Sequence, residues 1–530
     1  MDARNEGQPA HENNRDLTGG TAGDRNNTFT RRKFLGSIAA ASAVTIIPRH
    51  VLGGPGFVAP SDKLNIGQIG CGTQGIRQIT TGMGEREDLQ FTCVCDPNTD
   101  SSNYVDWSPT GIRDRVREFL EDPTWGENNK GVRAGREVAR EIFDAYYGKA
   151  NRSGTSQGVR SYADFRELLE QENDLDAVVI VTPDHAHAAI ATAALKKGVA
   201  AISHKPVSNK FNEVRTTVEV ARQSPKVTHL LAYSDREDYY TLDAWFKAGV
   251  IGPIREVHNW TYRPVWPQGW LDYPTEQPPV PAGFDWDLWL GPEKHRPYHP
   301  DYTFTVYRGW YNYGGGSFAD MGNYSLWAVY RLLNLDAPYS LTANANTVAF
   351  VNDESVSTTR MSEVAYPIAG TVHFRHAEAA GRPPIELYWY EGGVKPQTPP
   401  ELLDAGEDLE REGMMFVGDQ GKILCGYRGT DPRIIPQGRM VDVEGMIDPE
   451  ELEIVDSDDE WISAIKNGGK SRGSFESVSP LAEATALQGV AYRLSGQRLD
   501  WDGESMEFTN VPEANEFIRR DYREGWELKA

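Results

Sequence analysis

Short apolar runs alternate with amphipathic segments through the first half of the chain, which predicts strands alternating with helices. The all-apolar run at residues 177–181 is typical of a central parallel strand that is covered on both faces. Residues 161–171 carry an apolar stripe at helical spacing. The alternation predicts an α/β fold with a doubly wound parallel sheet. Its strands are predicted at residues 64–69, 89–95, 177–181 and 199–203.

A polar stretch of about residues 100–155 interrupts this alternation. It contains two amphipathic segments, at residues 112–120 and 132–147. A connection of this length is unusual in a compact domain, so added helices or a lid are both consistent with it.

Strand-like runs return in the second half and predict a second domain built on a sheet. We therefore expect a first domain at residues 62–235 and a second at 236–530, after a separate N-terminal segment of residues 1–60. The runs in the second half are residues 254–262, 341–351, 370–375, 385–390 and 413–417.

The N-terminal segment has the composition of a signal. Residues 1–29 are polar and are expected to be disordered. Arg31 and Arg32 then precede an apolar run, residues 35–47, that is too short for a bilayer core, which takes roughly 20 residues. The paired arginines resemble a twin-arginine signal, which implies the twin-arginine export machinery as a partner and a periplasmic or cell-envelope location. The alternative is that this segment is a basic tail on a cytoplasmic enzyme. If it is a signal, both its cleavage and its retention as an anchor stay open.

The net charge and the cysteine content limit the nucleic-acid partners and metal sites that can be expected. The net charge of −23 repels nucleic-acid phosphates, so no nucleic-acid partner is expected. Cys71, Cys93, Cys95 and Cys425 have neither a disulfide framework nor a paired metal-binding spacing, so no metal site is expected. This agrees with folding in a reducing compartment before export.

A glycine turn follows the first predicted strand. Gly70, Gly72 and Gly75 have GxGxxG spacing and precede a helix predicted at residues 76–83. Such a turn lets the backbone approach a pyrophosphate, with the helix N-terminus facing the phosphates. The candidate residues for holding a dinucleotide here are Gly70, Gly72, Thr73, Gln74 and Gly75.

Further cofactor candidates lie where later strands end. Asp96 ends the strand at residues 89–95, where a carboxylate accepts hydrogen bonds from an adenosine ribose. No arginine follows Asp96 closely in the sequence, so NAD is favoured over NADP. Thr182 and Pro183 end the strand at residues 177–181, at the edge where ligands of such sheets bind.

Several motifs then occur in order along the chain: IGQIGCGTQG, CVCDPN, YADFRELL, VIVTPDHAHA, AISHKPVS and YGGGSFADMGNYSLW. Together they resemble the glucose-fructose oxidoreductase and inositol dehydrogenase family, Gfo/Idh/MocA. The resemblance implies an N-terminal Rossmann domain. It also implies a C-terminal α/β domain with a large, mostly antiparallel sheet, which often forms the oligomer interface, so a homo-oligomer is expected. Most such proteins oxidise or reduce a sugar, inositol or related polyol with a nicotinamide cofactor.

The resemblance also implies site residues. The lysine of its Lys-Pro motif, Lys205 here, contacts nicotinamide ribose and substrate and acts with an aspartate and a histidine one helical turn apart. Asp320 matches the aspartate, but Tyr324 stands at the histidine position. Tyr324 is a poor base unless a cation, such as Lys205, lowers its pKa, so a proton relay and a packing aromatic both stay open.

Three histidines near the strand ends have competing interpretations. His187 matches a family histidine and is a candidate cofactor contact, although capping or packing is open for it and for His185. His204 replaces a common glutamate and is either functional or a strand-end residue satisfied by backbone. Asp184 is a natural N-cap for the helix that follows.

Aromatic residues and an arginine precede a triple glycine. Because aromatic faces stack on sugars and arginine donates to hydroxyls, Arg308, Trp310 and Tyr311 are candidates for the substrate site. Burial in the core is the alternative for each aromatic residue. Tyr313, Trp266 and Trp270 extend the same cluster.

Three functions remain open from the sequence. The first is an exported NAD-dependent oxidoreductase acting on a small-molecule carbohydrate, whose cofactor stays bound because no free nicotinamide pool exists outside the cytoplasm. The second is glycoside cleavage through a transient keto-sugar, which needs another acid or base such as His258 or His299. The third is a non-catalytic sugar- or cofactor-binding protein.

Overall fold

The structure is a computed structural model that describes residues 62–529, except 128–130, 150–157, 234–235, 449–451 and 453. The paired arginines and the rest of the N-terminal segment lie outside the described residues. Within the described part of the chain, every helix is too short or too polar to cross a membrane.

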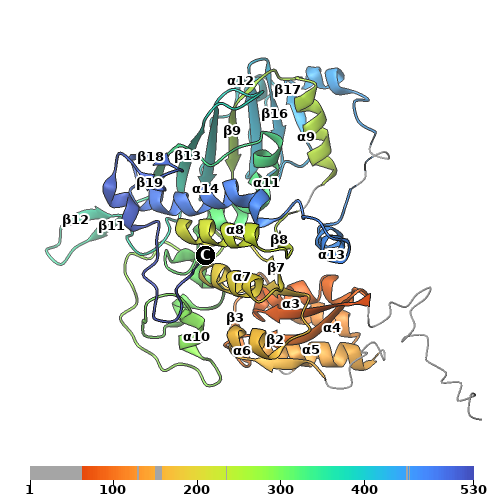
Figure 1. Cartoon of the computed structure of the whole chain (residues 1–530). Coiled ribbons are helices and arrows are strands. Elements are labelled where there is room, and N and C mark those ends of the chain that lie inside the picture. Colours follow the sequence, from red (N-terminus) through yellow and green to blue (C-terminus); the bar gives the residue numbers. More distant parts are fainter. Residues whose placement is uncertain are drawn as a thin grey trace, which may run out of the picture. The chain divides into compact units, whose positions relative to one another are not determined.

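The first sheet is parallel and has six strands in the order β5-β2-β1-β6-β7-β8. The order reverses between β1 and β6, which is the arrangement of a doubly wound Rossmann-type sheet. The predicted fold class is confirmed (Figure 1). The strands are β1 (Leu64–Ile69), β2 (Leu89–Cys95), β5 (Arg160–Tyr162), β6 (Ala177–Ile180), β7 (Ala200–Ser203) and β8 (Thr228–Leu230).

Helices α3 (Thr73–Ile79), α6 (Phe165–Gln171), α7 (His187–Lys196) and α8 (Phe211–Gln223) connect these strands. The predicted bounds of α3, 76–83, are wrong at both ends. The helix begins directly after Gly72, and it stops before Gly82, whose φ of 106° is incompatible with a helix. The prediction of one helix over 161–171 is also wrong at its start, because residues 160–162 pair with β2 and Asp164 caps α6.

The insertion consists of β3 (Ser101–Tyr104), α4 (Gly111–Leu120), β4 (Val132–Ala134) and α5 (Arg136–Lys149). It was predicted to hold two amphipathic segments, but the second begins as a strand, because residues 132–134 pair with β3. Helix α5 packs on the first sheet, where the ring of Phe143 stacks on Phe91 at 4.6 Å. The insertion therefore adds helices that cover the sheet.

The second sheet has nine strands in the order β17-β16-β15-β9-β14-β13-β10-β18-β19. Only β9 and β14 pair in parallel among its described strands, so the sheet is mostly antiparallel, as predicted. The strands are β9 (Ile254–Trp260), β10 (Ser340–Ala345), β13 (Gly370–His376), β14 (Ile385–Glu391), β15 (Gly413–Gly418), β16 (Gly421–Cys425), β17 (Arg433–Ile435), β18 (Arg498–Asp502) and β19 (Glu507–Phe508).

The single strand predicted at residues 341–351 is wrong. The chain forms β10 and then β11 (Val348–Val351), which pairs with β12 (Ser357–Arg360) in a separate hairpin. Strand β10 ends at Ala345, opposite Gly370 of β13, and beyond it the N–H of Ala369 donates to the side-chain oxygen of Asn346 instead of to a backbone carbonyl.

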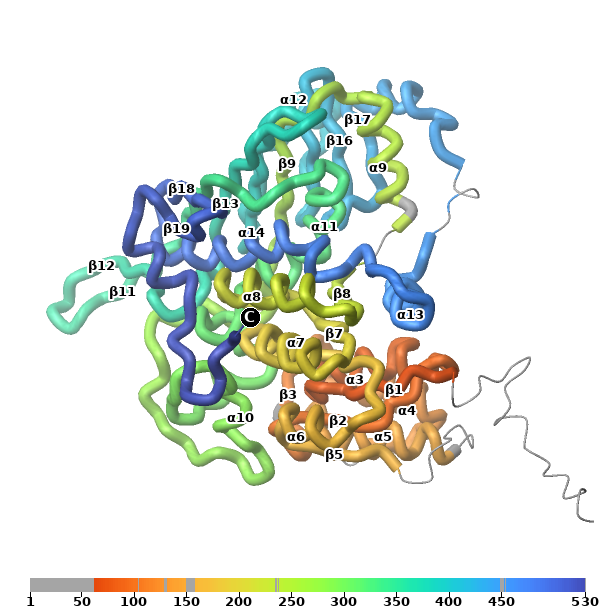
Figure 2. The backbone as a smooth tube through the Cα atoms, viewed as in Figure 1, coloured from red at the N-terminus to blue at the C-terminus, as the bar shows by residue number. Residues whose placement is uncertain are grey.

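Helix α14 (Phe475–Arg493) joins the two sheets. It packs on α8 on one side and on β10 on the other, and most of its residues are buried (Figure 2). Arg215 of α8 donates to Glu483 of α14 at 2.9 Å. Helices α9 (Glu237–Lys247) and α11 (Asn323–Leu332) pack against each other. After β19, the C-terminal tail leads back to α7 (Figure 1).

Candidate active site

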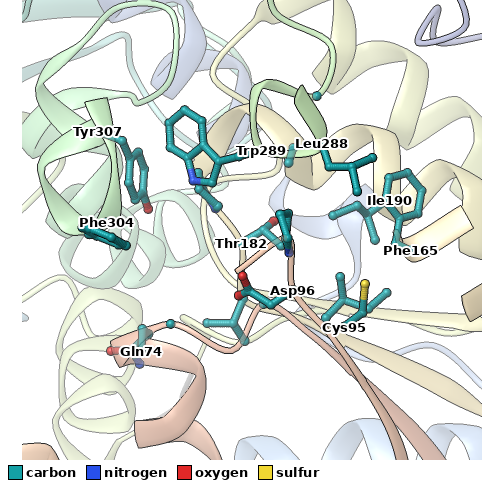
Figure 3. A pocket seen from close by; sticks show the side chains of 18 of the residues that line it. Gln74, Cys95, Asp96, Phe165, Thr182, Ile190, Leu288, Trp289, Phe304 and Tyr307 are labelled. Carbon is teal, nitrogen blue, oxygen red and sulfur yellow. The ribbon is translucent and has the colours of Figure 1, made fainter. Parts of the chain in front are cut away.

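A cavity with about 1050 Å³ of empty space opens at the carboxyl ends of β1, β2, β6 and β7. This is the edge at which doubly wound sheets bind ligands. In Figure 3, Asp96 and Thr182 lie between an apolar end, formed by Phe165, Ile190 and Leu288, and an end that carries Phe304 and Tyr307. Of the predicted cofactor residues, the cavity is lined by Gly70, Gly72, Thr73, Gln74, Asp96, Thr182 and Pro183.

The glycine turn is held by close backbone contacts. Gly70 has a φ of 95°, and a Cβ there would lie 2.3 Å from the carbonyl oxygen of Val181. A Cβ on Gly75 would lie 2.2 Å from the carbonyl oxygen of Gly70, so α3 can approach β1 only with glycine. Gly75 does not line the cavity. It shapes the turn that does.

Asp96 is buried at the end of β2 and lines the cavity. Its carboxylate accepts from the backbone N–H of Cys71 at 2.7 Å and of Asn98 at 2.8 Å. Burial raises the pKa of Asp96 to about 6, although these two N–H groups oppose the shift. An arginine does lie nearby in space: Arg136 of the insertion donates to the carbonyl oxygens of Asp96 and Pro97. The sequence around Asp96 contains no close arginine, but the fold brings Arg136 beside it.

The hydroxyl of Thr182 is buried and has no hydrogen-bond partner among the described residues. A buried polar group without a partner is costly, and ligand sites are a common reason for one. Together with the glycine turn and Asp96, this hydroxyl fits the polar parts of a nicotinamide dinucleotide.

Lys205 and Asp320 form a buried ion pair. Lys205 Nζ lies 2.7 Å from Asp320 Oδ1, and Arg308 Nε lies 3.4 Å from the same oxygen. Lys205 follows β7, whereas Asp320 belongs to a π-helical turn, Phe318–Gly322, directly before α11. The pair does not line the cavity itself but contacts Arg308, which does.

Burial controls the protonation of this pair. It lowers the pKa of Lys205 to about 8, helped by the charge of Arg308 and opposed by Asp320. Burial alone would raise the pKa of Asp320, but the charges of Arg308 and Lys205 outweigh it and hold that pKa well below its usual value. Near neutral pH the site therefore combines an ionised carboxylate with an amine that can give up its proton.

Tyr324 stands at the start of α11, beside this pair. Lys205 Nζ lies 5.3 Å from the centre of its ring, and its hydroxyl lies 3.3 Å from Nε2 of His204. Burial and the charge of Asp320 raise the pKa of Tyr324 to about 12. Of the two interpretations left open by the sequence, this raised pKa argues against Tyr324 as a base, because the phenol stays protonated near neutral pH. Its ring also lines a second pocket, of about 430 Å³, together with Trp327 and Arg428.

The neighbouring histidines make different contacts. His204 lines the cavity, and burial with the charge of Lys205 holds its pKa well below the usual value. Both ring nitrogens of His187 lie against backbone oxygens, Nδ1 at 2.6 Å from Pro206 and Nε2 at 2.8 Å from Thr182. His187 does not line the cavity, so it positions these strand ends, and the prediction of a direct cofactor contact is not supported. His185 is likewise buried between backbone oxygens.

Asp184 does not cap α7, contrary to the prediction. Its buried carboxylate accepts from Tyr307 at 3.2 Å, from Arg308 at 3.2 Å and from the backbone N–H of Gly315 at 3.0 Å. Asp184 therefore ties the edge of the first sheet to the segment that carries Arg308. No local pattern in the sequence points to this role, because the partners of Asp184 lie far along the chain.

The predicted substrate residues do not lie together at the cavity. Arg308 lines the cavity, but Trp310 is fully buried and stacks on Trp270 at 4.5 Å, and Tyr311 packs on Tyr366 away from the cavity. The core alternative therefore holds for both aromatic candidates, and Tyr313 is buried as well. Trp266 lies near Trp107 instead, at 6.0 Å between ring centres. The cavity residues that were missed include Phe165, Ile190, Phe284, Leu288, Trp289, Phe304, Thr305, Tyr307 and Trp526.

Comparison with known proteins supports the resemblance in two consecutive parts of the chain. Residues 127–231 match a family described as oxidoreductase family, NAD-binding Rossmann fold. Residues 252–378 match the oxidoreductase family, C-terminal alpha/beta domain. No curated protein matches the sequence.

Solved structures match over most of their own length. The WlbA dehydrogenase from Bordetella pertussis, in complex with NADH and UDP-GlcNAcA, is 14% identical, with a TM-score of 0.49, over 83% of this chain and 99% of that one. The aldose-aldose oxidoreductase from Caulobacter crescentus is also 14% identical, with a TM-score of 0.43 over the same shares. The two family matches lie in the domain order that the resemblance to Gfo/Idh/MocA proteins implies, an NAD-binding Rossmann domain followed by an α/β domain.

Proposed function

We propose that this protein oxidises a hydroxyl group of a sugar, polyol or glycoside with NAD as a bound, recycled cofactor. The observation that carries the proposal is the Lys205–Asp320 pair, at 2.7 Å, next to a cavity bounded by a glycine turn and Asp96. When bound, the nicotinamide supplies the hydride acceptor. The protein orients the substrate and the cofactor, and it supplies the group that takes the hydroxyl proton.

In this proposal Lys205 takes the proton of the substrate hydroxyl. A pKa of about 8 places its neutral form within reach at neutral pH, where a general base works best. Asp320 stays ionised and stabilises the ammonium group that forms. Tyr324 stays protonated and acts as a hydrogen-bond donor, so the missing family histidine does not remove the base.

The cavity residues divide between the parts of the cofactor. Asp96 would accept from the adenosine ribose, and the turn at Gly70, Gly72 and Thr73 would hold the pyrophosphate. The carboxylate of Asp96 disfavours a 2′-phosphate, and Arg136 does not offset this, because its guanidinium is directed to backbone oxygens. NAD is therefore proposed rather than NADP.

Export by the twin-arginine route, with a periplasmic or cell-envelope location, stays part of the proposal and rests on Arg31 and Arg32 alone. A bound cofactor fits this route, since it could be loaded before export. A homo-oligomer is proposed from the family resemblance.

The test is a single-turnover assay on purified protein with a panel of sugars, polyols and nitrophenyl glycosides. We expect the absorbance of reduced nicotinamide to appear on the bound cofactor with at least one compound, and no nitrophenol to be released. Release of nitrophenol without net reduction would favour glycoside cleavage. For that reaction His258 and His299 are poorly placed, because His258 lies against Tyr390 and Glu256 of the second sheet and His299 accepts from the backbone N–H of Asp301. A cofactor that no compound reduces would contradict the proposed oxidation.

A further inference from the structure

One residue of the C-terminal tail, Trp526, lines the dinucleotide cavity. The tail leaves β19, and its end lies beside α7 (Figures 1 and 2), where the Lys196 side chain donates to the carbonyl oxygen of Lys529. We propose that residues 518–529, the C-terminal clasp, close over the adenosine half of the cofactor and that Trp526 packs against its adenine. The inference rests on the proposed function, because it assumes that a nicotinamide dinucleotide binds there.

The adenine end of the cavity can be located from the strand order. Asp96 ends β2, and the next strand outward, β5, leads directly into Phe165. Lys205, by contrast, follows β7. Strands β6 and β7 lie on the opposite side of β1 from β2 and β5. A dinucleotide that places its ribose at Asp96 and its nicotinamide near Lys205 therefore places its adenine toward Phe165.

That end of the cavity is lined by apolar side chains, two of which are aromatic rings. Phe165, Ile190 and Leu288 gather there in Figure 3. The indole of Trp526 lies 6.0 Å from the ring of Phe165, centre to centre, and the guanidinium of Arg166 lies 4.3 Å from the indole. Aromatic faces are the usual partners of nucleobases, because every base offers a π-face for stacking.

The clasp is anchored by a buried arginine. Arg520 donates to Glu213 of α8 at 2.6 Å and to Asn209 at 2.7 Å, and it also contacts Glu293. The side chains of Arg520 and Glu213 are each only 2% exposed. A charge buried this deeply is stable only with its partners in place, so the tail is fixed to the first domain at this point.

A second arginine fixes the clasp to the segment that covers the same end of the cavity. Arg523 donates to the carbonyl oxygen of Gly291 at 2.6 Å and pairs with Asp287. Leu288 and Gly291 of this segment line the cavity beside Trp526. The clasp therefore holds both its own indole and the covering segment in place, and adenosine could leave only after these contacts open.

The test compares nucleotide binding by full-length variants that have been freed of bound nucleotide. Trp526→Ala is expected to weaken binding of AMP and of NAD by about tenfold, the size of one lost base–aromatic stacking contact. Binding of nicotinamide mononucleotide should be unchanged. Trp526→Phe should restore most of the affinity. Asp521→Ala is the matched control, since it lies in the same tail, is exposed and pairs only with Lys294 among the described residues.

A chain that ends at Gly525 is the second variant, because it keeps the Arg520 and Arg523 anchors. Labelled NAD should dissociate from it faster than from the wild-type chain, by a factor similar to that for Trp526→Ala. Unchanged AMP affinity and unchanged NAD dissociation in both variants would overturn the clasp and leave the proposed function standing. A wild-type chain that binds neither AMP nor NAD would overturn both.

Discussion

Lys205 Nζ and Asp320 Oδ1 lie 2.7 Å apart, in a pair that joins the end of β7 in the first sheet to the turn before α11 in the second domain. The base of the proposed reaction and the charge that tunes it therefore come from separate parts of the chain.

Replacing Lys205 with methionine removes the proposed base but keeps most of the side-chain volume. We expect single-turnover reduction of the bound cofactor to slow by at least ~100-fold, the usual contribution of a general base. Binding of AMP should not change, because Lys205 is remote from the Asp96 end. Lys226→Met, at an exposed position, is the control. A Lys205→Met protein with normal hydride transfer would rule out this lysine as the base.

The rate of oxidation should depend on pH through Lys205. Its neutral amine accepts the proton, so kcat/KM should rise with pH and level off above the pKa of about 8. Asp320 raises that pKa and Arg308 lowers it. Asp320→Asn should therefore move the inflection to lower pH, and Arg308→Met should move it to higher pH. Shifts of the same sign in both variants would contradict the assignment.

Cofactor affinity should depend on pH through Asp96. Ribose hydroxyls donate to its carboxylate, which is present above a pKa of about 6 and lost as the pH falls through that value. The affinity for NAD, measured by calorimetry, should fall below this pH in the wild-type chain. Asp96→Asn should bind NAD about tenfold more weakly, as expected for a lost charge-assisted hydrogen bond, and without this pH dependence. An equally steep pH profile in Asp96→Asn would assign the effect to another group.

Asp184→Asn should loosen the link between the first sheet and the segment of Arg308. The buried carboxylate has three donors, and one of them is a guanidinium. Breaking such a buried charge pair costs about 3 kcal/mol, so we expect a clear drop in the thermal unfolding temperature. Asp301→Asn, at a half-exposed carboxylate, should unfold like the wild type. Equal unfolding temperatures for the wild type and Asp184→Asn would show that this link contributes little.

The features that the sequence predicted well are local ones. The glycine turn, Asp96 and the ends of β1 and β2 follow from residues that are neighbours along the chain. Gly70 and Gly75 can be recognised from their spacing alone, because the turn requires glycine at both positions.

The features that were missed depend on contacts between distant segments. Asp184 looks like a helix cap until Tyr307 and Arg308 are placed beside it. Trp310 and Tyr307 are both aromatic residues before the triple glycine, and only packing decides that the first is core and the second lines the cavity. Spacing places Tyr324 one helical turn from Asp320, but it does not reveal the burial that, together with the charge of Asp320, raises the pKa of Tyr324.

Whether the cavity holds a resident nicotinamide cofactor is tested most directly by identifying any dinucleotide in native protein purified without added nucleotide. Denaturing the protein and analysing the released material by mass spectrometry should give NAD or NADH in an amount close to that of the protein. Protein that releases no dinucleotide, and that takes up neither NAD nor NADH when these are supplied, would contradict the account.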